Sequence, residues 1–387
     1  MMRAIIIILD GVGIGHAPDA DKYGDLGAQT LQHIAEKLGG IFWRNMWELG
    51  LSNIFPIEGM TRNPSPEGAF AHMVEKSAGK DSTSGHWEIG GLIVKKPFPV
   101  FPDGFPDEAI ELFEKAIGRE ILWNKPASGT EIIKKLGEEH IRTGKPIVYT
   151  SADSVFQIAA HEKIVPVGQL YEWCEVARRI LVGEYGVARV IARPFVGENG
   201  NFTRTPNRHD FSLPPFGKTM LDLAKDKGYP VVAIGKIYDL YAQQGITEHY
   251  HTDNNTDGIR QIIEQIENHR DGILMANLVD FDMKYGHRRN VIGFAAALRE
   301  FDNALVEIIS AMSDDDILFI TADHGNDPTH YGTDHTREQV PLLIYGKNVR
   351  PISLGQRETF ADLGATVCDI LGTEPAANGT SFKNEIM

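Results

Sequence analysis

Two clusters of carboxylates and imidazoles near the C-terminus have the residue types and spacing of metal ligands. In the first cluster, Asp282 lies five residues before His287. In the second, His324 directly follows Asp323 and lies eleven residues before His335. Mixed carboxylate and imidazole donors suit borderline divalent ions such as Mn²⁺, Zn²⁺ and Co²⁺. The two clusters therefore predict metal-dependent chemistry.

Three short apolar segments each deliver an aspartate at or just past their ends. They are residues 4–9 before Asp10, residues 273–279 before Asp282 and residues 317–321 before Asp323. Short, continuously apolar segments are typical of strands buried on both faces of a parallel sheet. Ligands of open α/β sheets bind at the carboxyl ends of such strands. We therefore expect one site with two metals, assembled from distant parts of the chain.

The remaining apolar residues alternate between helical and strand-like spacing. Helical spacing occurs at residues 31–38, 259–266, 294–312 and 360–370, and strand-like runs occur at residues 231–235 and 341–345. Such alternation predicts an α/β fold whose mostly parallel sheet is flanked by helices on both faces.

Prolines mark the limits of a segment with a different organisation. They cluster at residues 97–106 and again at residues 206–215. Strand-like and helical runs both occur between these clusters, which is typical of an α+β unit. We expect residues 97–215 to form an inserted cap domain, and residues 1–96 and 216–387 to form a discontinuous catalytic core. The alternative is that the inserted elements extend the main sheet.

Composition limits the classes of partner. A net charge of −15, with no basic stripe, argues against nucleic acid as a partner. No apolar run approaches the roughly 18 residues of a membrane helix, and the run at residues 4–9 is too short for a signal-peptide core. Cys174 and Cys368 fall in helical patterns and suggest no disulfide framework. We therefore expect a cytoplasmic protein; its oligomeric state is left open.

Three consecutive hydroxyl residues, Ser82, Thr83 and Ser84, stand before Gly85. In isolation this stretch could be a polar turn. A serine hydroxyl becomes a useful nucleophile near neutral pH when a base or a metal lowers its pKa. Because a two-metal site is predicted, the alternative to a polar turn is that one of these hydroxyls accepts a phosphoryl group.

Five motifs together resemble the phosphopentomutase family, which belongs to the alkaline phosphatase superfamily. They are residues 10–15, 81–88, 277–288, 321–327 and 333–338. The resemblance extends from one end of the chain to the other, keeps the motif order and includes the inserted segment. It implies an alkaline-phosphatase-like core with an inserted cap that contacts the substrate.

The resemblance also implies roles for individual residues. One metal would be held by Asp10, Ser82, Asp323 and His324, and the other by Asp282, His287 and His335. Ser82 matches the phosphorylated hydroxyl, which is usually a threonine in the family; register with Gly85 and His86 favours it over Thr83 and Ser84. The implied substrate contacts are Ser151, Asp153, Arg189, Ile191, Arg204 and Lys236.

The implied reaction interconverts α-D-ribose 1-phosphate and D-ribose 5-phosphate, and the 2-deoxyribose pair, through a phosphoserine and ribose 1,5-bisphosphate. The implied cofactors are two divalent metals, with Mn²⁺ expected, and a bisphosphorylated sugar as primer. The alternatives are a cofactor-independent phosphoglycerate mutase, a phosphatase of the same superfamily, or a binding protein with structural metals. The last is disfavoured because structural zinc sites are usually rich in cysteine.

Overall fold

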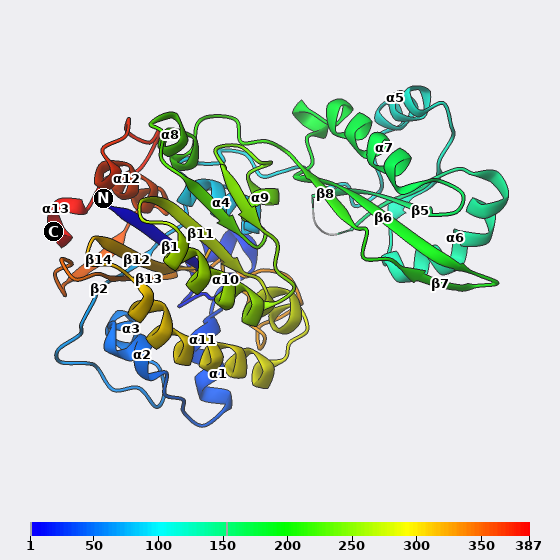
Figure 1. The fold of residues 1–387 in the computed structure, drawn as a ribbon. Helices are drawn as coiled ribbons and strands as arrows, with labels where there is room; N and C mark the ends of the chain where they lie inside the picture. The colour runs from blue at the N-terminus through cyan, green and yellow to red at the C-terminus, as the bar shows by residue number, and fades with distance from the viewer. Residues whose placement is uncertain (1, 152–153) are drawn as a thin grey trace. The chain divides into compact units, whose positions relative to one another are not determined.

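A computed structural model describes residues 2–151 and 154–387. The chain divides into two compact units, drawn in Figure 1. The core unit comprises the residues up to Lys96 together with Pro215–Met387, and the inserted unit is Pro97–Pro214.

An eight-stranded sheet forms the centre of the core unit, in the order β10-β9-β11-β1-β12-β13-β2-β14. Its strands are β1 (Arg3–Leu9), β2 (Ala69–Met73), β9 (Val231–Ile234), β10 (Glu248–Tyr250), β11 (Gly272–Leu278), β12 (Asp316–Thr321), β13 (Val340–Tyr345) and β14 (Ser353–Arg357). The five strands from β10 to β12 are parallel to one another, whereas β13 is antiparallel to both β12 and β2. The predicted α/β fold with a mostly parallel sheet is confirmed.

The central strand β1 is buried along its whole length. This burial includes Arg3, whose Nε and Nη2 donate to the two carboxylate oxygens of Asp316 on β12 at 3.1 and 2.5 Å. Arg3 and Asp316 are also direct partners in the strand register. A buried charge needs such a paired and hydrogen-bonded partner, so the pair fixes how β1 aligns with β12.

Helices cover both faces of this sheet. They are α1 (Thr30–Lys37), α2 (Arg44–Glu48), α3 (Leu51–Ile54), α4 (Ser82–Ile89), α8 (Met220–Asp226), α9 (Ile237–Leu240), α10 (Asn255–Asn268), α11 (Val291–Ala311), α12 (Ala361–Leu371) and α13 (Lys383–Ile386). Helix α11 contacts α1, α2 and α10, whereas α12 contacts α4, α8 and α13. Figure 1 shows α1, α2 and α11 on one side of the sheet, with α8 and α12 on the other.

The inserted unit has a sheet of its own, in the order β3-β4-β5-β6-β7, with β8 also paired to β6. Its elements are α5 (Asp107–Ile117), β3 (Leu122–Pro126), α6 (Gly129–Thr143), β4 (Ile147–Thr150), β5 (Val155–His161), α7 (Val167–Ile180), β6 (Arg189–Glu198), β7 (Asn201–Arg204) and β8 (His209–Ser212). In the described part of the chain, none of these strands pairs with the core sheet. The alternative that the insertion extends the main sheet is therefore wrong.

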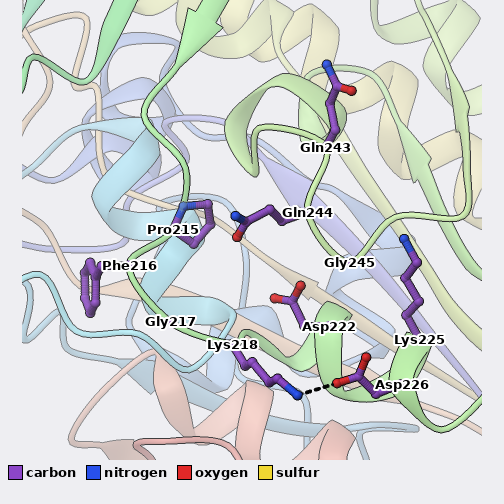
Figure 2. A pocket seen from close by; sticks show the side chains of 10 residues that line it. All are labelled: Pro215, Phe216, Gly217, Lys218, Asp222, Lys225, Asp226, Gln243, Gln244 and Gly245. Carbon is purple, nitrogen blue, oxygen red and sulfur yellow. Dashed lines mark hydrogen bonds and ion pairs between the residues drawn. The ribbon is translucent and has the colours of Figure 1, made fainter. Parts of the chain in front are cut away.

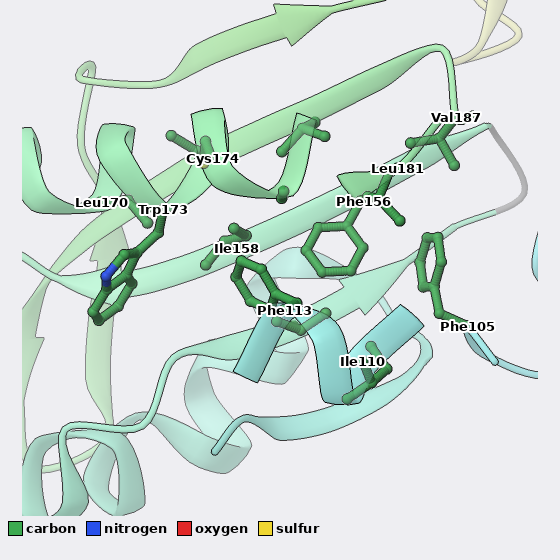
Figure 3. Packing of buried hydrophobic residues seen from close by; sticks show 14 of the residues in the cluster. Phe105, Ile110, Phe113, Phe156, Ile158, Leu170, Trp173, Cys174, Leu181 and Val187 are labelled. Atoms are coloured by element: carbon green, nitrogen blue, oxygen red, sulfur yellow. The ribbon is translucent and has the colours of Figure 1, made fainter. Parts of the chain in front are cut away.

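Two hydrophobic clusters hold the inserted unit together. Phe113 of α5, Trp173 of α7 and Phe156 of β5 belong to the larger cluster, which Figure 3 shows between these helices and the sheet. The smaller cluster packs α6 against the opposite face, around Tyr149 and Phe195. Consecutive residues of a strand point to opposite faces, so alternate positions of β5 and β6 face α6.

A polar cleft of about 540 Å³ lies in the core unit beside α8. Figure 2 shows Lys218 and Asp226 paired across its rim, with their nitrogen and oxygen 2.6 Å apart. A second lysine, Lys225, donates to the backbone oxygen of Ile246. None of the predicted site residues lines this cleft, so it is separate from the site described next.

Candidate metal centre

Three neighbouring parallel strands bring the predicted aspartates to one edge of the core sheet. Strand β1 pairs with both β11 and β12 up to its last residues. Asp10 directly follows β1, and Asp323 follows β12 after a single residue. Asp282 lies in a π-helical turn, Phe281–Gly286, that begins shortly after β11. Parallel strands in register end at the same edge, so these distant carboxylates become neighbours.

Asp10, Asp323 and His324 form a fully buried group whose ligand atoms all lie within 4.8 Å of one another. Nε2 of His324 is 3.5 Å from Oδ1 of Asp10 and 3.4 Å from Oδ2 of Asp323. The same nitrogen lies 3.1 Å from Oγ of Ser82. Two carboxylates, an imidazole and a hydroxyl therefore surround one small volume.

A second group consists of Asp282, His335 and again His324, within the same 4.8 Å limit. Nε2 of His335 is 3.3 Å from Oδ1 of Asp282, and Nε2 of His287 is 3.2 Å from Oδ2 of that carboxylate. The rings of His324 and His335 stack with their centroids 3.9 Å apart. His324 therefore lies between the two groups, and the seven predicted metal ligands gather in one place.

The charges of the carboxylates strongly influence one another. Burial, followed by the charges of Asp323 and Asp282, raises the pKa of Asp10 to about 7. Burial would also raise the pKa of Asp323, but His324 and His86 hold it at about 2. Like charges crowded into a buried site favour protonation or a bound cation. The electrostatics are those of a site that needs positive charge.

Oδ1 of Asp10 is buried without a hydrogen-bond partner among the described residues, and Oδ2 of Asp323, which is also buried, has Nδ1 of His86 at 3.1 Å. A buried acceptor left unpaired costs free energy. Both oxygens face the volume around Nε2 of His324. Carboxylate, imidazole and hydroxyl ligands suit a borderline divalent cation, so the residues present fit such an ion.

Helix α4 begins at Ser82 and determines where the three neighbouring hydroxyls lie. Asp81 is its N-cap, and its Oδ1 accepts hydrogen bonds from the backbone nitrogens of Thr83 and Ser84 at 3.0 and 3.1 Å. Oγ of Ser84 donates to the other oxygen of Asp81 at 2.7 Å. A side chain at Gly85 would put its Cβ 2.0 Å from the backbone oxygen of Asp323. Glycine therefore allows α4 to approach the metal groups closely.

Comparison with known proteins identifies the family. A model of the metalloenzyme superfamily matches residues 2–375. The phosphopentomutase of Caldanaerobacter subterraneus subsp. tengcongensis is 58% identical over 387 residues, covering 100% of this chain and 98% of that protein. The phosphopentomutase of Kosmotoga olearia is 58% identical over 388 residues, covering 100% of both.

The chain belongs to the phosphopentomutase family. The predicted resemblance is confirmed, and with it the enzyme class, which is an isomerase of the intramolecular phosphotransferase type. A solved structure of an alkaline phosphatase superfamily protein from Vibrio parahaemolyticus aligns with 96% of this chain and 66% of that chain, at 13% identity and a TM-score of 0.44. That likeness concerns the fold and adds no argument about function.

Two further findings bear on cofactors and partners. Membership of a metalloenzyme superfamily agrees with the two candidate metal groups, without identifying the metal. No helix in the described part of this phosphopentomutase-family chain is long and apolar enough to cross a membrane.

The predicted substrate contacts of this phosphopentomutase-family chain are divided between the two units. Lys236 follows β9 in the core and lies near enough to Asp10 to lower the pKa of that carboxyl against the raising effect of burial. Ser151 follows β4 of the inserted unit and is half-buried, and Ile191 is buried in β6. Asp153 lies outside the described residues.

Arginines gather on the α6 side of the inserted sheet. Arg189 lies 3.4 Å from Asp210, and Arg204 donates to Oγ1 of Thr130 at 3.0 Å. Arg208 donates to both oxygens of Asp210 at 2.7 Å. With Arg193, these arginines concentrate guanidinium groups on this face of the inserted sheet, in a chain of net charge −15.

Arg193 of β6 is another arginine of this face. Its Nε donates to Oε1 of Gln157 at 3.0 Å. Burial and the nearby Arg208 lower the pKa of Arg193 to about 10. Burial raises the pKa of the Tyr149 hydroxyl, and the positive charges of Arg193, Arg204 and Arg208 lower it in part. The hydroxyl and the guanidinium groups form one polar patch.

Several buried residues that orient the metal groups were missed by sequence reasoning. Asn326 donates from Nδ2 to Oδ1 of Asp282 at 2.6 Å. Nδ1 of His287 lies 2.7 Å from the backbone oxygen of Thr333. Partners of this kind fix the orientation of metal-binding carboxylates and imidazoles. Asn326 lies inside a matched motif, but its role depends on a residue 44 positions away.

Glu338 and Arg337 are two further buried residues whose roles were missed. Glu338 accepts hydrogen bonds from N and Oγ1 of Thr30 at 2.9 and 2.7 Å and from Oγ1 of Thr336 at 2.7 Å. Arg337 donates to Glu75 and to the backbone oxygens of Ser77 and Gly79. The two side chains tie the loop that carries His335 to the segments that lead into α1 and α4.

Proposed function

We propose that the chain interconverts α-D-ribose 1-phosphate and D-ribose 5-phosphate, and the 2-deoxyribose pair, by way of a phosphorylated Ser82. Family membership supplies the reaction. The observation that supports the residue is the 3.1 Å distance from Oγ of Ser82 to Nε2 of His324, within the group that also contains Asp10 and Asp323.

Two divalent cations, Mn²⁺ in our proposal, would occupy the two groups. Asp10, Ser82, Asp323 and His324 would hold one, and Asp282, His287 and His335 the other. When bound, such a metal pair lowers the pKa of a coordinated hydroxyl and neutralises the nonbridging oxygens of the transferred phosphoryl group. The unpaired oxygen of Asp10 supports the first assignment.

Ser82 acts as the phosphoryl carrier, and a bisphosphorylated sugar primes it. The Oγ–P bond of phosphoserine breaks while the free hydroxyl of the bound sugar phosphate forms a new O–P bond, and the hydroxyl proton ends on Oγ of Ser82. The product of this step is ribose 1,5-bisphosphate. Its other phosphate then returns to Ser82 after the sugar has reversed its orientation. Because phosphoryl transfer requires little covalent chemistry from the protein, most of the catalysis is positioning and charge stabilisation.

The inserted unit contributes substrate contacts from Ser151, Asp153, Arg189, Ile191 and Arg204, and the core contributes Lys236. Guanidinium groups present paired donors that match phosphate oxygens, and their concentration on one face of the inserted sheet supports this role. We also propose that residues 97–215 act as a cap that keeps water from the phosphoserine. The structural unit ends one residue earlier, at Pro214.

A cytoplasmic location belongs to the same proposal. Cys174 and Cys368 are both free and buried. Thiols persist in reducing compartments, which supports this location.

A coupled assay tests the reaction directly. Ribose 1-phosphate is supplied with Mn²⁺, with and without a bisphosphorylated sugar, and formation of ribose 5-phosphate is measured alongside inorganic phosphate. We expect ribose 5-phosphate, with the primer shortening any lag. Release of inorganic phosphate in its place would indicate a phosphatase, and turnover of phosphoglycerate in a parallel assay would indicate the related mutase.

A further inference from the structure

His86 is a buried residue next to the nucleophile to which no role has yet been given. It lies one turn after Ser82 on α4 and has no exposed surface. Its Nδ1 is 2.7 Å from the backbone oxygen of Ser82 and 3.1 Å from Oδ2 of Asp323. Its Nε2 is 3.3 Å from Nδ2 of Asn277. The ring therefore lies between the nucleophile and two strand ends.

The orientation of Asn277 determines which ring nitrogen carries a hydrogen. The Nδ2 group of Asn277 also lies 3.0 Å from Oδ2 of Asp10. When Asp10 is charged, as a metal-bound carboxylate is, the opposite amide orientation would set two oxygens against each other, so the NH₂ group faces Asp10. Its second hydrogen then points at Nε2 of His86, which accepts. A histidine that accepts at Nε2 carries its hydrogen on Nδ1, from which it donates to the oxygen of Ser82.

Hydrogen bonds to Tyr241 and Leu240 hold the C-terminal part of α4. The hydroxyl of Tyr241 donates to the backbone oxygen of His86. Nε1 of Trp87 donates to the backbone oxygen of Leu240 at 3.0 Å. These bonds anchor the last turn of the short helix, whereas His86 acts on its first turn, where Ser82 lies.

We propose that His86 is a positioning residue that links the nucleophile to a metal ligand, through the sequence Ser82, His86, Asn277, Asp10. Its Nδ1–H fixes the turn that presents Oγ of Ser82, and its Nε2 fixes the amide that orients Asp10. The inference rests on the proposed function, because it assigns a purpose to the placement of Ser82. Residues that orient a metal ligand change metal affinity or activity by about 10- to 100-fold when replaced.

Two substitutions at His86 separate this role from simple packing. The amide of asparagine can place a donor near the position of Nδ1, whereas glutamine reaches only the position of Nε2. We expect His86→Gln to lower kcat by about 10- to 100-fold with little change in KM for ribose 5-phosphate, and His86→Asn, which keeps only the Nδ1 link that presents Ser82, to recover part of that loss. Equal losses in both variants, or a change confined to KM, would overturn the proposal.

His140 provides a matched control. It is also fully buried, its Nδ1 lies 2.7 Å from the backbone oxygen of Lys145, and its Nε2 accepts from the backbone nitrogen of His161. It belongs to the inserted unit, whereas the residues of the metal groups belong to the core unit. His140→Gln should lower thermal stability without the large fall in kcat. An equal fall in kcat would show that any buried histidine produces the effect, and would overturn the assignment.

A spectroscopic measurement tests the inference without using mutase activity. In the protein loaded with diamagnetic Zn²⁺, the ¹⁵N shifts of the His86 ring report which nitrogen is protonated, and the His86→Asn variant assigns the signal. We expect the Nδ1–H tautomer; protonation at Nε2 would overturn the proposal. If the unsubstituted protein showed no mutase activity, the proposed function would be wrong. The tautomer of His86 would still show whether its two ring nitrogens form the proposed hydrogen bonds.

Discussion

The metal groups of the core and the arginine face of the inserted unit are built in opposite ways. Asp10, Asp323 and His324 are at most 1% exposed, and they project from the ends of parallel strands whose spacing the sheet determines. In the arginine face, Arg189 and Arg193 lie on β6, Arg204 on β7 and Arg208 between β7 and β8, and their side chains remain partly or largely exposed. The core site is therefore preorganised by burial, whereas the arginine face remains solvated.

This difference has an energetic consequence. A buried ligand has no water to replace a lost partner, so its removal leaves other charged groups unpaired. A solvated arginine keeps water as an alternative partner, so its removal costs a single interaction. We expect substitutions in the core to change the chemical step or the metal content sharply, and substitutions in the inserted unit to change substrate affinity by degrees.

The largest effect is expected for Ser82→Ala. Without Oγ there is no phosphoryl acceptor, so the phosphoenzyme disappears and mutase activity falls by roughly a thousandfold or more, while metal content stays near its original value. Phosphoprotein analysis by mass spectrometry and metal analysis measure the two quantities. Ser84→Ala is the matched control, because Oγ of Ser84 is engaged with Asp81 and its loss should leave the phosphoenzyme intact. A phosphoenzyme retained in Ser82→Ala would move the nucleophile to Thr83 or Ser84.

The second effect distinguishes the two metal groups. His324 belongs to both groups and His335 to one. We expect His324→Ala to weaken chiefly the binding of the metal held with Asp10 and Asp323, and His335→Ala to weaken the binding of the metal held with Asp282 by about 10- to 100-fold more than that of the other. Manganese titration followed by electron paramagnetic resonance counts the bound ions. Equal loss of both metals in His335→Ala would contradict the division of ligands.

A smaller, graded effect is expected in the inserted unit. Arg204→Ala should raise KM for ribose 5-phosphate on the order of tenfold, because Arg204 is a proposed phosphate contact and its removal takes away a charge-assisted hydrogen bond. The variant should keep most of kcat. Arg142→Ala is the control, since Arg142 is an exposed arginine near the far end of α6. If Arg204→Ala lowered kcat sharply and left KM unchanged, the contrast between the two regions would break down.

Burial and strand order explain which parts of the fold could be predicted. The continuously apolar runs before Asp10 and Asp323 predicted β1 and β12 to within a residue or two, because only a strand covered on both faces has that composition. Strand β2 and its neighbour β14, which lies at the edge of the sheet, carry a weaker pattern and were not predicted. Strand β13 was predicted as a strand, but its antiparallel direction depends on its neighbours and has no local signal.

The same reasoning applies to the site. The ligands were found because carboxylates and imidazoles at strand ends are unusual, and the family motifs added the register of Ser82. His86 had a local signal, since it lies four residues after Ser82 and so on the same face of a helix. Glu338 had none, because its partners Thr30 and Gly15 are more than 300 residues away. Roles that depend on such contacts become visible only in the folded chain.

The last prediction concerns stability rather than chemistry, and it follows from Glu338. Burial raises the pKa of Glu338 from 4.5 to about 7, so between these values the folded chain holds a proton that the unfolded chain has lost. The contribution of Glu338 to stability is therefore greatest below pH 4.5 and falls as the pH rises to about 7, by at most about 1.4 kcal/mol per pH unit.

Glu338→Gln removes this titration while keeping the shape of the side chain. At about pH 5 the melting temperature of the variant should be lower than that of the unsubstituted chain, because the amide cannot accept all the hydrogen bonds of the carboxylate. This difference in melting temperature should become smaller as the pH rises from about 5 to about 7. Calorimetry of the metal-free proteins measures the difference. A constant difference across this range would mean that Glu338 is charged throughout, and that the hydrogen bonds from Thr30 and Thr336 outweigh its burial.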